Sequence, residues 1–205
     1  MPSKSNRVPI YSDTDNTDSN ETAKKVVPGH RTYSETLKGE KKATIFSTSI
    51  TKGIKASAFN QDYENGKAQF QLFRGKKAMH IKHYIKSHLE EEVPDQVLIH
   101  EGGNDLPDPI PINDLAHHII EAGEISRRYG VKEVYIAGVT ARPGLQRRCY
   151  KLNDMLEQLC KKRNFIYVNN DNISLSHLYD GVHIGDAGSK ILAKNYLQSL
   201  MNSRL

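Results

Sequence analysis

The 205-residue sequence has few cysteines and no long apolar stretch, and both absences narrow the class of protein. The two cysteines, Cys149 and Cys160, are too few for a disulfide scaffold and lack the spacing of a metal-binding pair. We expect both thiols to be reduced and packed. No signal-peptide core and no apolar run of about eighteen residues occurs. These absences predict a soluble protein without a membrane span, with the cytoplasm as the default location.

The chain also lacks a strong excess of charge of either sign. It carries 29 Lys and Arg residues against 24 Asp and Glu residues, a net charge of +5. This mild basic excess is compatible with a nucleic-acid partner, but the dense Lys and Arg cluster of a nucleic-acid arm is missing. A glycine-rich dinucleotide motif and a P-loop are missing as well, which argues against a nucleotide-binding domain.

The first 42 residues differ in composition from the rest of the chain. Residues 12–25, SDTDNTDSNETAKK, are rich in Ser, Thr, Asp and Asn and show no apolar period. Such a segment cannot offset its ordering entropy by burial, so we predict a disordered or linking tail over residues 1–42. Residues 43–205 form the predicted folded domain.

The folded domain alternates between apolar strand patterns and helical periodicity. Strands are predicted at 43–46, 68–73, 95–102, 131–139 and 165–170, and helices at 81–92, 112–130, 145–164 and 186–205. Parallel strands need crossover helices, so this order predicts a three-layer, flavodoxin-like α/β domain: a five-stranded parallel sheet with helices on both faces. In such sheets the reactive groups gather at the carboxyl ends of the strands.

A serine follows the first predicted strand. In residues 44–54, TIFSTSITKGI, an apolar pair runs into three small hydroxyl residues, and residues 50–54 are suited to open a helix. A strand that ends in a hydroxyl and turns directly into a helix is one way to present a nucleophilic serine. Ser49 is therefore a candidate nucleophile, with a helix N-cap as the alternative.

Later loops hold the other groups that acyl transfer needs. Asp180 and His183 stand three residues apart in the last loop, so the carboxylate can orient the imidazole that activates the serine. Asn104 and the backbone N–H groups of Ser49 and Gly75 could converge on an oxyanion. The alternatives are an ordinary turn residue for Asp180 and a surface histidine for His183.

These blocks resemble those of the SGNH/GDSL hydrolase superfamily. The match consists of Ser49, Gly75, G-G-N-D at 102–105 and D-G-V-H at 180–183, in the family's order, and covers about residues 43–203. The chain also resembles the esterase-like domains found in many invertebrate genomes, some of them linked to non-LTR retrotransposons.

The resemblance implies a serine hydrolase that acts on carboxylic esters. Carried over by motif, Ser49 is the nucleophile, His183 the base and Asp180 its orienting carboxylate. Gly75 and Asn104 complete an oxyanion hole with the Ser49 backbone. No metal or organic cofactor is implied, and the expected substrate is a small-molecule, lipid or carbohydrate ester.

The first block departs from the family's usual G-D-S, because this chain has Ser47, Thr48 and Ser49 there. Thr48 replaces an aspartate that braces the loop, and a hydroxyl cannot form a charge-assisted hydrogen bond. The departure motivates a second hypothesis: a catalytically weakened domain that serves as a binding or assembly module, associated with nucleic acid or a retroelement protein.

Basic residues are predicted at the rim of the site. Lys52 follows the first strand, Lys76 the second and Arg142 the fourth. They are either solvated or suited to a negatively charged substrate or partner.

Overall fold

The computed structural model describes residues 40–64 and 66–202. The strands are β1 (Lys41–Ser47), β2 (Gly66–Leu72), β3 (Gln96–His100), β4 (Glu133–Ala137) and β5 (Ile166–Val168). The helices are α1 (Ala56–Asp62), α2 (Ala78–Glu91), α3 (Ile112–Arg128), α4 (Gln146–Arg163) and α5 (Asp186–Met201), with short 3-10 turns η1 (Ser49–Thr51) and η2 (Leu175–His177). The predicted tail, residues 1–42, lies outside the described residues except for its last three, and β1 begins within those three.

The strands form one sheet in the order β2-β1-β3-β4-β5, and each neighbouring pair is parallel. The sheet is built outward from β1 in both directions: β2 lies on one side of β1, and β3 lies on the other. Ser47 pairs with Leu72 and with His100, so these three strands end at the same level. Ligands of such sheets bind outside the carboxyl ends at this switch point. The segments after β1, β2 and β3 therefore start side by side.

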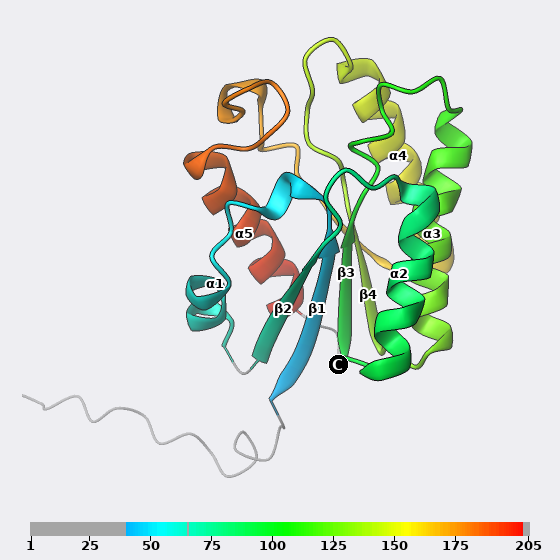
Figure 1. Ribbon diagram of the computed structural model, residues 1–205, viewed down its shortest axis with the longest axis vertical. Helices are drawn as coiled ribbons and strands as arrows, with labels where there is room; N and C mark the ends of the chain where they lie inside the picture. Colours follow the sequence, from blue (N-terminus) through cyan, green and yellow to red (C-terminus); the bar gives the residue numbers. More distant parts are fainter. Residues whose placement is uncertain (1–39, 65, 203–205) are drawn as a thin grey trace, which may run out of the picture. The chain divides into compact units, whose positions relative to one another are not determined.

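Helices cover both faces of the sheet, which confirms the predicted three layers (Figure 1). Helices α1 and α5 lie on one face, and α2, α3 and α4 lie on the other. Each interlayer space has its own core cluster: Ile45, Leu98 and Tyr135 belong to the first, and Phe46, Ile99 and Ile136 to the second. Successive side chains of a strand point to opposite faces, so strands buried on both faces are apolar throughout.

Helix α1 is absent from the sequence prediction, which placed a helix start at residues 50–54 instead. Those residues form η1 and a link, and α1 begins later. The link passes so close to α5 that an ideal Cβ on Gly53 would collide with the Ser189 hydroxyl. Phe59 is the single buried residue of α1, so the helix has no apolar period for a pattern to detect.

Two further predictions concern the cysteines of α4 and the absence of a membrane-spanning helix. Cys149 and Cys160 are free thiols buried in the core, as expected. Within residues 40–64 and 66–202, no helix combines the length and apolar character needed to span a bilayer.

Candidate active site

Ser49 lies directly after β1 and is the first residue of η1. Ser47 stabilises the turn with two hydrogen bonds. Its hydroxyl is hydrogen-bonded to that of Thr51, and its carbonyl oxygen accepts a 2.7 Å hydrogen bond from the N–H of Phe73. Ser49 is half-buried, and its hydroxyl makes no hydrogen bond to any described residue. The N-cap position belongs to Thr48, whose buried side chain makes no capping bond. The Ser49 oxygen is therefore available to a base or a substrate.

Asp180 and His183 are joined by a network of short contacts. The Asp180 Oδ2 lies 2.6 Å from His183 Nδ1, and Oδ1 accepts hydrogen bonds from the N–H groups of Val182 (2.9 Å) and His183 (2.7 Å). These contacts, the one with the imidazole first, hold the pKa of Asp180 well below its usual range. The ring of Tyr179 stacks on the imidazole with the centroids 5.8 Å apart. The ring is thus held with Nδ1 toward the carboxylate, which leaves Nε2 for a reacting group.

The loop that carries this pair is a small hairpin closed by an antiparallel bridge between Leu178 and Ile184. Gly181 has a φ of 79°, a conformation that side chains rarely adopt, and allows the chain to reverse there. Asp180 therefore acts as a turn residue and as the partner of the imidazole at once, so the two interpretations of the sequence are compatible.

The loops after β2 and β3 are fastened to each other. The side-chain amide of Asn104 donates a 2.9 Å hydrogen bond to the carbonyl oxygen of Lys76, and the Asp105 carboxylate accepts the N–H of Ala78 at the start of α2 (3.1 and 3.3 Å). An amide has two N–H groups, so one of those on Asn104 remains for a ligand. Gly75, next to Lys76, is exposed with a φ of 68°. The predicted oxyanion donors from these two loops are therefore mutually positioned.

The residues that follow Ser49 and His183 are buried on the α5 side of the sheet. Ile50 and Ile184 directly follow these two residues and belong to the same core cluster. The link after η1 also comes close to α5, where Gly53 lies against Ser189, six residues after His183. Among the described residues no hydrogen bond joins Ser49 to His183.

A buried polar layer lies beneath the G-G-N-D block, and the sequence analysis missed its main member, Glu101. Both carboxyl oxygens of Glu101 are buried without a hydrogen-bond partner, and burial raises the pKa of this group well above its usual value. On β3, the His100 Nδ1 lies 2.5 Å from the Tyr196 hydroxyl, and burial lowers the pKa of His100 to about 4. Burial thus favours the uncharged forms of both Glu101 and His100. An acidic residue between an apolar strand and a glycine pair was the available signal.

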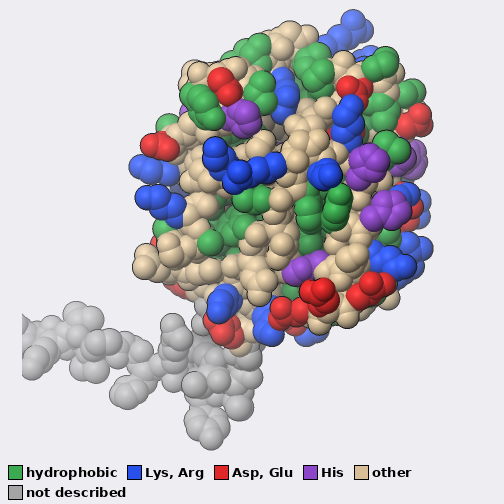
Figure 2. All heavy atoms as spheres, in the orientation of Figure 1, with side chains coloured by type: hydrophobic (Ala, Val, Ile, Leu, Met, Phe, Trp, Pro, Cys, Tyr) green, Lys and Arg blue, Asp and Glu red, His purple; other side chains and the backbone are tan. Residues whose placement is uncertain are grey.

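The three predicted rim residues differ in their surroundings. Lys52 and Lys76 are exposed, and the Lys76 ammonium lies 5.6 Å from the centre of the Tyr84 ring. Arg142 is half-buried and leans over Gly103, where an ideal Cβ would lie 3.4 Å from its Nη2. Figure 2 shows cationic side chains across the middle and upper part of one face, while acidic ones gather at the lower edge, toward the amino ends of the strands.

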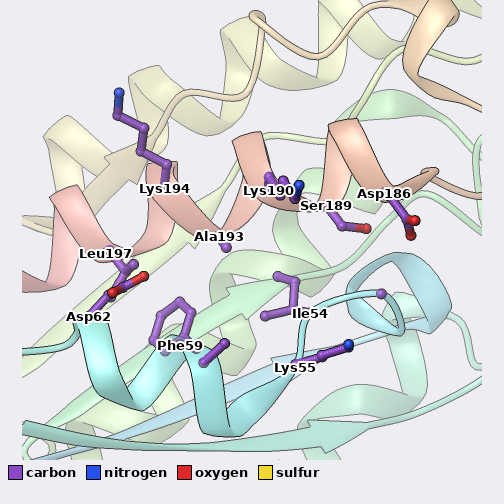
Figure 3. Close-up of a pocket in the computed structure, with 12 residues that line it drawn as sticks. Ile54, Lys55, Phe59, Asp62, Asp186, Ser189, Lys190, Ala193, Lys194 and Leu197 are labelled. Atoms are coloured by element: carbon purple, nitrogen blue, oxygen red, sulfur yellow. The ribbon is translucent and has the colours of Figure 1, made fainter.

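A groove of about 610 Å³ runs between α1 and α5 (Figure 3). Ile54, Phe59, Ala193 and Leu197 form its apolar lining, with polar side chains such as Lys190 along its edges. No predicted catalytic or oxyanion residue lines this groove, so it is separate from the candidate active site.

Comparison with solved structures identifies the fold. A GDSL-like lipase from Bacteroides thetaiotaomicron has a TM-score of 0.67 and 17% sequence identity, over 79% of this chain and 88% of that chain. The aryl esterase of M. smegmatis has a TM-score of 0.69 at 14% identity, over 78% and 98% of the two chains. An acetylxylan esterase from Geobacillus stearothermophilus, solved as a catalytic mutant, has a TM-score of 0.66 at 15% identity, over 79% and 94%. No family model and no curated protein matches the sequence. The chain therefore has the fold of the SGNH/GDSL hydrolases.

Proposed function

We propose that the protein is a serine esterase that cleaves a carboxylic ester through Ser49, His183 and Asp180. The observation that carries this proposal is the 2.6 Å contact of Asp180 with His183, in the loop that leads into α5, the helix that the link after the unpartnered Ser49 approaches at Ser189. An imidazole oriented by a carboxylate is what a serine hydroxyl needs to become a nucleophile. The esterases of similar fold support the proposal, and the acetylxylan esterase was solved with a serine replaced by alanine as a catalytic mutant.

The first half-reaction transfers the acyl group to the enzyme. The Ser49 oxygen attacks the acyl carbon while His183 Nε2 takes the hydroxyl proton, and Asp180 stabilises the imidazolium that forms. The tetrahedral oxyanion is bound by Asn104 and by the N–H groups of Ser49 and Gly75. Collapse breaks the ester C–O bond, and His183 gives its proton to the departing alcohol.

The second half-reaction returns the enzyme to its starting state. Water attacks the acyl–Ser49 ester while His183 accepts one of its protons. Collapse of the second tetrahedral intermediate breaks the bond to Ser49, which regains a proton from the imidazolium. A carboxylic acid leaves, and the same donors serve both oxyanions.

A second candidate function is a binding or assembly module with little or no catalysis, associated with nucleic acid or a retroelement protein. The observation that favours it is the absence of a hydrogen bond between the Ser49 hydroxyl and His183. The side chain of the neighbouring Thr48 also makes no hydrogen bond that could brace the turn. Catalytic hydrogen bonds of unliganded enzymes often tighten only in the substrate complex, so this geometry is compatible with both functions.

Hydrolysis of a short p-nitrophenyl ester separates the two functions. Wild type, Ser49→Ala and His183→Ala are compared at matched concentration, and both variants are expected to lose activity by roughly 10⁴-fold or more. A matched control is Ser57→Ala, which changes an exposed serine of α1 outside the candidate active site. A fluorophosphonate should label wild type and Ser57→Ala but not Ser49→Ala.

Equal hydrolysis by all four proteins would assign the activity to background or to another site. An inert wild type, in both hydrolysis and labelling, would favour the binding module. Salt-sensitive binding to RNA or DNA that persists in Ser49→Ala would then be its direct support.

A further inference from the structure

Arg142 is half-buried, and its guanidinium makes no hydrogen bond or ion pair to any described residue. The other half-buried arginine of the described residues, Arg148, donates through Nη2 to the carbonyl oxygens of Asp108 and Ile110 at 3.1 and 2.8 Å, although its buried Nε has no partner. A guanidinium carries five N–H donors, and removing it from water without acceptors costs free energy. Burial accordingly lowers the pKa of Arg142.

The guanidinium lies near two parts of the proposed active site. An ideal Cβ on Gly103 would be 3.4 Å from Nη2 and 3.9 Å from both Cζ and Nε, so the flat group lies against the backbone beside Asn104. The negative charge of Asp180 also acts on Arg142 through space, without an ion pair between the two side chains. The group therefore lies close to the backbone beside the proposed oxyanion donor and within electrostatic reach of the proposed orienting carboxylate.

The backbone of Arg142 is held in place by its neighbours. Its carbonyl oxygen accepts a 3.1 Å hydrogen bond from the N–H of Leu145, and Gly144 reverses the chain with a φ of 73°. Pro143 packs against the loop of the base, since an ideal Cβ on Gly181 would lie 3.4 Å from its ring. The side chain thus starts from a fixed point, which reduces the entropy lost when it binds a ligand.

We propose that Arg142 binds an anionic group of the substrate, a carboxylate or a phosphate, close to the scissile ester. This inference rests on the proposed esterase function and assigns its substrate class. Guanidinium donates two parallel hydrogen bonds to either anion, which a lysine ammonium cannot do. A neutral ester would leave the donors of Arg142 unused, whereas an anionic one supplies the acceptors and the counter-charge. The exposed Lys52 and Lys76 add attraction at longer range.

The test compares esters that differ only in charge. Monomethyl glutarate and methyl pentanoate have the same acyl chain, which ends in a carboxylate or a methyl group. The acetate esters of 2-hydroxyethyl phosphate and 2-methoxyethanol form the phosphate arm. Wild type should prefer one anionic ester by roughly tenfold or more in kcat/KM, and the arm with the larger preference identifies the anion.

The preference should depend on Arg142. Arg142→Gln is expected to lower the ratio of anionic to neutral kcat/KM by roughly 10- to 100-fold, and Arg142→Lys to recover part of it. Arg147→Gln removes the same charge from an exposed position at the start of α4 and should keep the wild-type ratio. An equal loss on both esters in Arg142→Gln would show a structural role and overturn the inference.

A binding measurement keeps this result distinct from the test of catalysis. Calorimetric titration of Ser49→Ala with glutarate and with inorganic phosphate should show saturable binding of the preferred anion. Adding Arg142→Gln should weaken it at least about tenfold. Arg142-dependent binding without hydrolysis would refute the esterase and keep the anion site. Hydrolysis without anion preference and without Arg142-dependent binding would keep the esterase and refute the inference.

Discussion

The proposed base loop (residues 178–184) and the proposed nucleophile turn (residues 47–51) are held by different forces. In the base loop one carboxylate, that of Asp180, has three short polar contacts. In the nucleophile turn the Ser47 hydroxyl is tied to a neighbour, whereas those of Thr48 and Ser49 have no partner within the described part of the chain. The imidazole is therefore positioned by electrostatics and hydrogen bonds, and the serine by packing and backbone geometry.

This difference shows what replacing the first-block aspartate changes. The Asp180–His183 pair draws its contacts from its own hairpin, so it is unaffected by the residue at position 48. The serine lacks the charge-assisted brace that an aspartate supplies and relies on Ser47 and the buried Ile50. Reaction rates are sensitive to misplacement of about 1 Å, so the turn is where activity can be tuned.

Breaking the base loop should have the largest effect. Asp180→Asn removes the charge that orients the imidazole, and kcat for an accepted ester is expected to fall by roughly 10³- to 10⁴-fold. Asp186→Asn, an exposed change in the first turn of α5, is the control. Steady-state kinetics measure kcat for each enzyme. An Asp180→Asn variant whose kcat is within tenfold of the wild-type value would rule out the Asp180–His183 pair as the catalytic base.

Removing an oxyanion donor should cost less. Asn104→Ala is expected to lower kcat by roughly 10²- to 10³-fold, with a smaller change in KM, because the interaction forms in the transition state. Asn113→Ala, on an exposed face of α3, serves as the matched control. A variant in which KM alone rises would place Asn104 in ground-state binding instead.

Two substitutions in the nucleophile turn should differ from each other. Ser47→Ala breaks the contact with Thr51 and should lower the free energy of unfolding by about 1 kcal/mol. Thr48→Val keeps the shape of a side chain that makes no hydrogen bond and should change it by less than about 0.5 kcal/mol. Urea unfolding measures both, and equal losses would contradict the assignment of the brace to Ser47.

The smallest expected effect is on stability in acid. It distinguishes the loop held by the charge of Asp180 from the turn held by the uncharged Ser47. The pKa of Asp180 is held below its ordinary value of 3.8, so this group stabilises the fold above that pH and loses its contribution as the pH falls through the lower, folded value. Asp180→Asn should therefore destabilise the protein more at neutral pH than in strong acid. Ser47→Ala should show the same destabilisation at both. Urea midpoints across this range measure the difference, and parallel curves would contradict it.

The sequence was most informative where a pattern is local. Apolar runs and helical periods located the five strands and the four longer helices, α2 to α5. Burial of a strand on both faces, or of a helix along one stripe, requires a regular pattern of apolar residues that the sequence shows directly. Helix α1 left none, since Phe59 is its single buried residue. The candidate site residues were predicted as blocks behind strands, which is where parallel sheets in general place reactive groups.

Other features depend on contacts that no local pattern contains. The pairing of Ser47 with Thr51 required the turn geometry, and the position of Arg142 over Gly103 required the meeting of two loops. Glu101 follows an apolar strand, but its lack of hydrogen-bond partners emerges only from the packed structure. Predictions of chemistry from sequence were therefore strongest for residue type and weakest for residue surroundings.

The contact of Tyr196 with His100 joins positions 96 residues apart and depends on the last helix of the fold. During synthesis, α5 leaves the ribosome after every other described element, so the buried layer under the G-G-N-D block closes last. The Ser49 turn also lacks its neighbour until then. A nascent chain that ends before α5 would hold all the proposed catalytic residues yet have no assembled site. The candidate site would thus be assembled only after α5 has been synthesised.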